Sequence, residues 1–315
     1  MKKIPNRQVH LDFHTSEMID QVGSKFSAEE FADTLKNANV EAVTLFTRCH
    51  HGNLYYDSTK YPERIHPHLK VKDMYREQAK ECRKKGIKVY LYTTICWDIR
   101  VAAEHPEWVA IDDYARISRR ETGNIFEDPG FHVDLCINSP YREFCKEQIA
   151  DALENCPVDG VLVDASFVVE CCCPRCRKSM LEKHLNPADP QDRKKHAWQI
   201  YYDFVREMTD YLHEIDSDYD IFFNKGHVGA QDIPVRDCFD YVAVESQPAN
   251  CGYMDFPVSA RYLRTWGVPV VGMTGRFLTG WGDNNSYRNQ AALEYESFSA
   301  LSYGGLCNIG DQLPP

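Results

Sequence analysis

The sequence contains no uninterrupted apolar run long enough to cross a bilayer. Its basic start, residues 1–8, is not followed by the apolar stretch that is typical of a signal peptide. A block of basic residues is also missing: 36 Lys and Arg stand against 47 Asp and Glu, which gives a formal charge of −11. An acidic chain of this kind is poorly suited to nucleic acid or to an anionic membrane. We therefore expect a cytoplasmic protein with neither nucleic acid nor a membrane as its partner.

Two further absences concern glycine and disulfide patterns. No Gly-x-Gly-x-x-Gly follows the first expected strand, so a dinucleotide-binding fold has no support. The 13 cysteines are an odd number, and a chain of 315 residues is large enough to fold without a disulfide framework. Free or metal-bound thiols in a reducing compartment are the expectation.

Short apolar segments alternate with amphipathic stretches along the chain, and no linker interrupts them. This alternation predicts a parallel sheet, and eight units predict one (β/α)8 barrel, a TIM barrel, over residues 1–315. A doubly wound open sheet is the alternative. The expected strands are residues 8–13, 41–47, 87–94, 161–163, 219–224, 241–245, 269–273 and 306–309.

Several expected helices have recognisable ends. Ser27 and Glu30 form a capping box before the first helix, Gly86 closes a helix over 70–85, and a long helix is expected over 196–216. Because the sequence stops soon after the eighth strand, we expect the barrel to lack its eighth helix, either as a short form or as the front of a larger protein. An unfinished barrel leaves apolar surface uncovered, so we also expect homo-oligomers.

Polar or aromatic residues stand at the carboxyl ends of the expected strands. In a (β/α)8 barrel these ends meet on one face, where the active sites of such barrels lie. Each residue alone has an ordinary explanation, such as a helix-capping Asp or a His that only serves as a hydrogen-bond partner. Their recurrence predicts one shared pocket. The residues expected to line it are His14, His50, His51, Trp97, Asp164, Asn224, His227, Glu245 and Arg276.

Asp164 and Glu245 end the fourth and sixth expected strands and so should face each other across that pocket. Cleavage of a glycosidic bond needs two carboxyl groups, one to attack the sugar and one to protonate the leaving oxygen. Such chemistry requires no cofactor, and a carbohydrate is the expected partner. A metal-dependent hydrolase is the rival interpretation. Its candidate ligands are His10, Asp12, His14, His50 and His51.

The stretch 97–138 shows weak periodicity and many polar residues. A loop of this length in a compact domain is usually functional. We expect it to form a wall or lid of the pocket.

Three segments carry a resemblance to known families. Residues 48–58, Arg-Cys-His-His-Gly-Asn-Leu-Tyr-Tyr-Asp-Ser, are similar to the paired-histidine motif of α-L-fucosidases of glycoside hydrolase family 29. Residues 10–16, His-Leu-Asp-Phe-His-Thr-Ser, and the Asp-Gly-x-x-x-Asp of 159–164 resemble the group called hypothetical glycosyl hydrolase 6. That group includes the fucosidases of family 151, and its members usually carry further C-terminal domains.

The resemblance implies a retaining glycoside hydrolase of the α-L-fucosidase type. In family 29 the acid that ends strand four is the nucleophile, which implies that role for Asp164. The histidines after strands one and two bind the sugar, which implies that role for His14, His50 and His51. The other expected substrate-binding residues are Trp97, Asn224, His227 and Arg276.

The acid/base is assigned from position alone. Glu245 receives this role because it ends the sixth expected strand. Asn53 departs from the family 29 motif after the histidine pair, which leaves the sugar open. A β-galactosidase-like glycosidase of another specificity and a non-catalytic carbohydrate-binding barrel are the alternatives.

Cys171, Cys173 and Cys176 have the spacing of metal ligands, and a fourth thiolate would complete a tetrahedral zinc site. β-Galactosidases of glycoside hydrolase family 42 have a similar Cys-x-Cys-x-x-Cys after strand four. They add a cysteine upstream in an Asn-Ser-Pro-Tyr-Arg-like context, which Cys136 resembles. The likeness implies a structural zinc, since four thiolates leave no position for water. A set of reduced thiols is the alternative.

Overall fold

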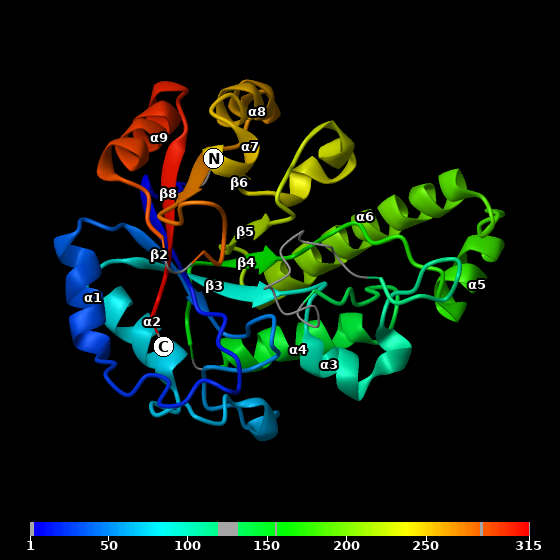
Figure 1. The fold of residues 1–315 in the computed structure, drawn as a ribbon, viewed down its shortest axis with the longest axis horizontal. Helices are drawn as coiled ribbons and strands as arrows, with labels where there is room; N and C mark the ends of the chain where they lie inside the picture. The colour runs from blue at the N-terminus through cyan, green and yellow to red at the C-terminus, as the bar shows by residue number, and fades with distance from the viewer. Residues whose placement is uncertain (1–2, 119–131, 155, 284–285, 315) are drawn as a thin grey trace.

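Eight parallel strands form the centre of the molecule (Figure 1). The computed structural model describes residues 3–118, 132–154, 156–283 and 286–314, so the part of the expected wall at 119–131 lies outside the described residues. The strands are β1 (Arg7–Asp12), β2 (Ala42–Phe46), β3 (Lys88–Thr94), β4 (Gly160–Asp164), β5 (Asp220–Phe223), β6 (Val242–Glu245), β7 (Val270–Gly275) and β8 (Leu306–Gln312).

The order of hydrogen-bonded neighbours is β5-β4-β3-β2-β1-β8-β7-β6. The first and last strands of the chain, β1 and β8, therefore pair with each other, and the sheet curls into a nearly closed barrel. This confirms the predicted (β/α)8 barrel. The doubly wound alternative is wrong, because an open sheet would leave β1 and β8 apart.

The seam of the barrel lies between β5 and β6, for which no backbone ladder occurs within the described residues. Isolated hydrogen bonds at the two ends join the strands instead, two of them through side chains. At the amino end, the Asp240 carboxylate accepts a hydrogen bond from the Ile221 N–H at 2.9 Å, and the Asp240 N–H donates to the Ile221 carbonyl at 3.1 Å. At the carboxyl end, Asn224 Nδ2 donates to Glu245 Oε2 at 3.2 Å.

The strand residues are buried on both faces, as expected for a parallel sheet with helices outside and side chains inside. All five residues of β2 are buried. Alternation along β3 turns Tyr90 and Tyr92 into the barrel, where Tyr90 contacts Tyr241 across the interior. Tyr92 stacks on Phe46 with ring centroids 3.8 Å apart. The interior therefore contains a packed aromatic core.

The described helices are α1 (Ala28–Asn37), α2 (Met74–Lys84), α3 (Ile99–Glu104), α4 (Tyr141–Leu153), α5 (Pro174–Glu182), α6 (Pro190–Ile215), α7 (Pro248–Cys251), α8 (Asp255–Leu263) and α9 (Gln290–Ser302). α1 begins as predicted, with Ser27 Oγ accepting the Glu30 N–H at 3.3 Å. α6 begins six residues earlier than predicted because Asp189 caps it through the Gln191 N–H and Pro190 suits its first position.

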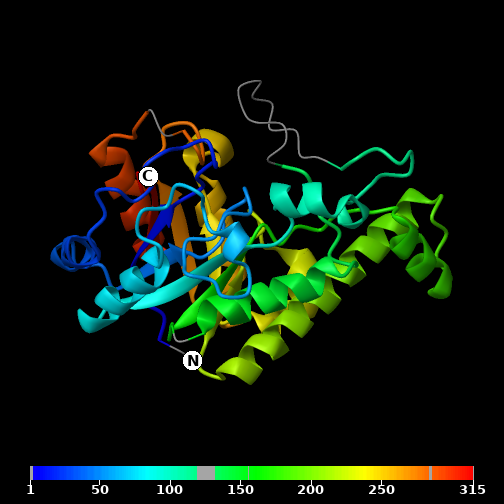
Figure 2. The same ribbon diagram turned by 90° about the horizontal axis from the view of Figure 1, so that it is seen from below.

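α5 and α6 extend away from the barrel to one side, at the right of Figures 1 and 2. A 3₁₀ segment, Ala230–Cys238, takes the place of a helix between β5 and β6. Among the described residues, no helix follows β8, as expected. None of the described helices is both long and apolar enough to cross a membrane.

Candidate active site

Asp164 and Glu245 lie together at the carboxyl end of the barrel. Asp164 ends β4 and accepts hydrogen bonds from Tyr92 Oη at 2.6 Å and from Asn224 Nδ2 at 2.8 Å. The same Asn224 nitrogen donates to Glu245 Oε2 at 3.2 Å. Since both bonds share one nitrogen, the two carboxyl oxygens lie no more than 6.0 Å apart, the sum of the two bond lengths.

The two carboxyl groups differ in their affinity for protons. Burial and the charge of Asp164 raise the pKa of Glu245 to about 7; Asp12 adds to this rise, whereas His10 and the Asn224 hydrogen bond oppose it. Burial also raises the pKa of Asp164 above its ordinary value, but the hydrogen bonds from Tyr92 and Asn224 work against that rise. Near neutral pH, Glu245 can therefore hold a proton.

Two stacked histidines stand beside Asp164. The rings of His14 and His50 lie 4.0 Å apart between centroids, and His50 Nε2 is 3.9 Å from Asp164 Oδ2. Thr94 Oγ1 lies 2.8 Å from His50 Nδ1 and fixes that ring. Burial lowers the pKa of His14 to about 4 and holds the pKa of His50 well below its usual value. Both rings are neutral at pH 7, and a neutral imidazole can both donate to and accept from a hydroxyl group.

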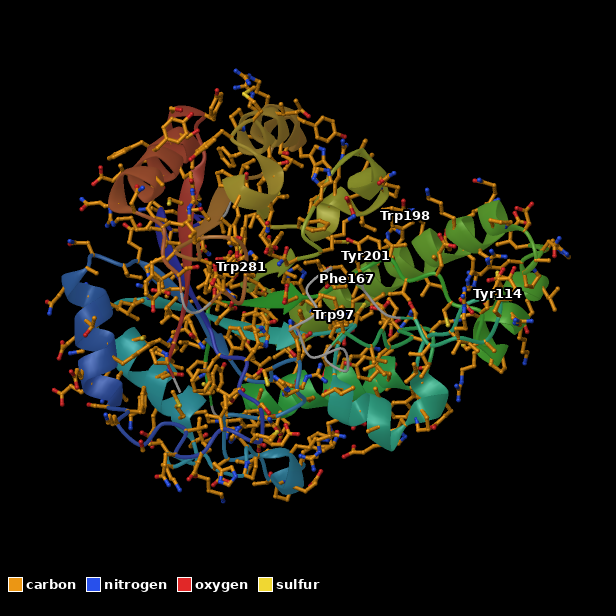
Figure 3. All side chains as sticks on the ribbon, viewed as in Figure 1. Trp97, Tyr114, Phe167, Trp198, Tyr201 and Trp281 are labelled. Atoms are coloured by element: carbon orange, nitrogen blue, oxygen red, sulfur yellow. The ribbon has the colours of Figure 1, made fainter. Side chains whose placement is uncertain are left out.

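Trp97 forms an aromatic wall next to these histidines. Its ring meets His50 edge-on at 5.0 Å and packs against Phe167 at 4.7 Å between centroids. The indole Nε1 donates to Asp134 Oδ1 at 3.0 Å. Figure 3 shows Trp97 and Phe167 side by side near the carboxyl ends of β3 and β4, with Trp281 also close to the centre of the view.

The structure gathers seven of the nine expected residues around the carboxylate pair at this end of the barrel. His51 follows His50, is partly buried, and acts electrostatically on both His14 and His50. The seven residues are His14, His50, His51, Trp97, Asp164, Asn224 and Glu245.

The other two expected residues also follow strands at this end of the barrel, but their described surroundings differ from those of the seven. His227 is exposed, because the turn at Gly226, with φ +78°, carries the chain outward after Asn224. Arg276 pairs with Asp311 Oδ2 of β8 at 2.6 Å and lies 3.9 Å from the centroid of the Tyr287 ring. Arg276 is therefore held by β8, which runs past residue 309, where the predicted strand ends.

Sequence reasoning passed over Tyr92 as a site residue. Burial and the neighbouring Asp164 raise the pKa of Tyr92 well above its ordinary value, so it stays a proton donor. Because side chains alternate between the two faces of a strand, Tyr92 could have been placed inside the barrel from its position in β3. His10, Asp12 and His14 are spaced two residues apart, which likewise places Asp12 on the same face of the chain as the two histidines. Asp12 Oδ1 lies 3.0 Å from His10 Nε2. Trp281, which meets the His10 ring edge-on, had no such signal because it lies in a loop.

The rival interpretation requires a metal ion bound by the histidines and Asp12, and their ligand atoms do not form such a cluster among the described residues. Among the residues that the structure describes, one group brings three or more His, Cys, Asp or Glu ligand atoms within 4.8 Å of one another, and it consists of cysteines. The two carboxyl groups therefore stay the candidate reactive groups of this site.

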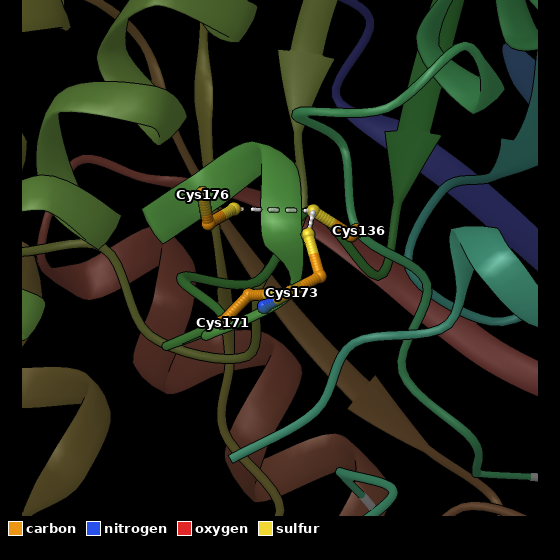
Figure 4. Close-up of side chains that lie close together, drawn as sticks. All are labelled: Cys136, Cys171, Cys173 and Cys176. Atoms are coloured by element: carbon orange, nitrogen blue, oxygen red, sulfur yellow. Dashed lines mark hydrogen bonds between the residues drawn. The ribbon is translucent and has the colours of Figure 1, made fainter. Parts of the chain in front are cut away.

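The cysteine group combines Cys136 with Cys171, Cys173 and Cys176, all buried (Figure 4). Cys136 Sγ lies 3.5 Å from Cys176 Sγ and 3.9 Å from Cys173 Sγ. Disulfide sulfurs would be about 2.05 Å apart. Sulfurs on a tetrahedral zinc with bonds of about 2.3 Å would be about 3.8 Å apart. The observed spacing suits a metal site better than two disulfides.

Comparisons with known proteins agree with this fold. Residues 27–165 match the protein family described as hypothetical glycosyl hydrolase 6. α-L-Fucosidase isoenzyme 2 from Paenibacillus thiaminolyticus is 32% identical and has a TM-score of 0.90, covering 99% of this chain and 46% of the fucosidase. No curated protein matches the chain in sequence. The comparisons thus relate the barrel to the fucosidase-like glycosidases, as the sequence resemblance implied.

Two more distant solved structures share the fold. A β-galactosidase from the psychrophilic Marinomonas ef1 is 13% identical with a TM-score of 0.68, covering 97% of this chain and 54% of that one. A family 29 α-L-fucosidase from Bacteroides thetaiotaomicron is 16% identical with a TM-score of 0.55, covering 93% and 57%. The chain spans about half the length of the three structures named here.

Proposed function

We propose that this chain is the catalytic barrel of a retaining exo-glycosidase of the α-L-fucosidase type. The observation that carries the proposal is the Asn224 amide, which bridges two carboxyl oxygens no more than 6.0 Å apart. Retaining glycosidases need carboxyl groups about 5–5.5 Å apart, whereas inverting enzymes leave about 6.5–9.5 Å for a water molecule. The bridge favours direct attack on the sugar by one of the two carboxylates.

In the first step, the Asp164 carboxylate attacks the anomeric carbon, and protonated Glu245 gives its proton to the departing glycosidic oxygen. The C–O bond to the leaving group breaks as the ester to Asp164 forms. In the second step, the Glu245 carboxylate takes a proton from water, whose oxygen attacks the same carbon and releases Asp164. Two inversions restore the configuration of the substrate.

The difference in pKa between the two groups supports this division of roles. Tyr92 and Asn224 stabilise the ionised form of Asp164, whereas burial and the nearby Asp164 charge keep Glu245 protonated up to about pH 7. The neutral rings of His14 and His50 suit sugar hydroxyls, and Trp97 offers a flat surface for an apolar sugar face. Fucose is favoured over other sugars because the 32% identical relative is an α-L-fucosidase.

A panel of chromogenic glycosides tests the class of enzyme. We expect turnover of an aryl α-L-fucoside and much weaker turnover of the matching β-D-galactoside. Turnover of the galactoside alone would favour the β-galactosidase-like alternative. Fucose binding without hydrolysis of any glycoside would favour the non-catalytic barrel.

A small anion should partly restore the activity of a variant that lacks the proposed nucleophile. Asp164→Gly should lower kcat on an aryl α-L-fucoside by more than about 10³-fold, because the attacking group is gone. Azide should then restore part of the rate and yield a fucosyl azide of inverted configuration, since it fills the vacated space. Asp189→Gly, which removes only a helix cap on α6, is the control and should keep its activity. Wild-type turnover by Asp164→Gly would rule out the assignment.

Substitution of Glu245 should depend on the leaving group and on pH. Glu245→Ala should lose about 10²–10⁴-fold on substrates with poor leaving groups, but far less on activated aryl glycosides, which need little protonation. Wild-type kcat/KM should fall above pH 7 as Glu245 loses its proton, and the variant should lack that fall. The exposed Glu214→Ala is the matched control. An equal loss on all leaving groups would contradict the acid/base role.

We also propose that the chain self-associates through the outer face of α8 and α9. Large apolar side chains are exposed there, with Phe298 at 65% and Val258 at 58% exposure. Sedimentation should show a dimer or larger species, and Phe298→Glu should shift it toward the monomer. Leu181→Glu, on α5 at the other side of the molecule, is the control. A wild-type monomer at all concentrations would contradict this proposal.

A further inference from the structure

The four-cysteine cluster lies at the ends of the two segments that hold Trp97. Asp134, which accepts the Trp97 indole N–H, stands two residues before Cys136. Phe167, whose ring packs on Trp97, stands four residues before Cys171. Both supports of the aromatic wall therefore run directly into the same group of thiols.

Backbone hydrogen bonds join these segments into one unit. The Leu135 N–H donates to the Cys96 carbonyl at 2.8 Å, next to Trp97, and the Cys136 N–H donates to the Trp108 carbonyl at 2.8 Å. Trp97 and Asp134 also form an antiparallel bridge. Any constraint on the position of Cys136 is thus transmitted over two residues to the group that fixes the indole ring.

The apolar group around the thiols is small. The cysteines belong to a cluster separate from the barrel core, whose other buried members are Ala110 and Met180, with Ile111, Val169 and Leu185 packed against it. The sulfur spacing described above excludes disulfides in this arrangement.

The surroundings of the sulfurs suit thiolates that bind a metal. Asn138 Nδ2 donates to Cys176 Sγ at 3.5 Å, and the Cys173 N–H donates to Cys171 Sγ at 3.4 Å. Such donors orient thiolate ligands and stabilise their charge. Four thiolates in tetrahedral array are the preferred ligands of Zn²⁺.

We propose that the four thiolates bind one zinc ion, and that this ion holds Trp97 in the pocket wall through Asp134 and Phe167. The metal part stands on the cysteine geometry and on the family 42 likeness, whereas the sugar-binding consequence rests on the proposed function. The zinc takes no part in the chemistry at Asp164. Its removal should loosen the wall and weaken sugar binding, and leave the roles of the two carboxyl groups unchanged.

Metal content tests the first half of the proposal. Protein purified under reducing conditions without added metal should contain about one equivalent of zinc, and Co²⁺ exchanged into it should show thiolate charge-transfer absorption. Cys173→Ser should lose the metal, while Cys172→Ser, the neighbour outside the group, should keep it. Less than about a tenth of an equivalent in the fresh wild type, or equal loss in both variants, would overturn the site. If Cys173→Ser fails to fold, the site is tested instead by removing zinc from the wild type with a chelator and measuring whether added zinc binds again.

Hydrogen exchange tests whether the metal fixes the wall. Stripping zinc from the wild type should speed exchange at the amides of Leu135, Cys136 and Cys172, and re-addition should restore their protection. Amides of β1 and β2 provide the internal control and should not change. Unchanged exchange at 134–136, or equal acceleration throughout the barrel, would overturn the link from the metal to the wall.

A thermodynamic cycle tests the link to Trp97, with L-fucose as the probe in calorimetry. Removing zinc should weaken fucose binding by up to about tenfold in the wild type, the contribution expected of one aromatic face. In the Trp97→Ala variant the same removal should have little effect. An equal loss in both backgrounds would contradict the proposed route. If no form binds fucose, the fucosidase proposal fails, and metal content with hydrogen exchange still decides the zinc site.

Discussion

The shared hydrogen bonds of Asn224 are the interaction on which the candidate site depends. Two carboxyl groups this close, in a buried pocket, cannot both ionise without a large electrostatic cost. The Asn224 amide and the Tyr92 hydroxyl lower that cost at Asp164, and the remaining repulsion keeps a proton on Glu245. One hydrogen-bond network therefore supports the opposite roles proposed for these two similar side chains.

The hydrogen bonds of Asn224 lie at the seam of the barrel, between β5 and β6. In the part of the chain that the structure describes, no backbone ladder spans the seam of β5 and β6, so Asn224 is both a candidate site residue and part of the join between the strands. The next residue, Lys225, pairs with buried Asp232 at 3.1 Å and lies 4.8 Å from the ring centroid of Trp198 on α6 (Figure 3). Helix α6 thereby anchors the end of β5 and, through it, the position of the Asn224 amide.

The sequence was sufficient for the barrel and for most strand ends, because both follow from local periodicity. Asp164 and Glu245 end strands that carry clear apolar runs, so their convergence could be anticipated. His227 and Arg276 could not be placed in this way. Their directions depend on a positive-φ turn at Gly226 and on a partner at Asp311, which are tertiary facts. Trp281 reaches the candidate site from a loop, where neither the periodicity of apolar residues nor motif spacing predicts the position of a side chain.

The stereochemistry of hydrolysis tests the central claim most directly. NMR spectra recorded during rapid hydrolysis of an aryl α-L-fucoside reveal which anomer forms before mutarotation mixes the two. The arrangement of Asp164 and Glu245 predicts that α-L-fucose appears first, because two displacements retain the configuration. First formation of β-L-fucose would mean a single displacement by water, and would contradict the role of Asp164 as nucleophile.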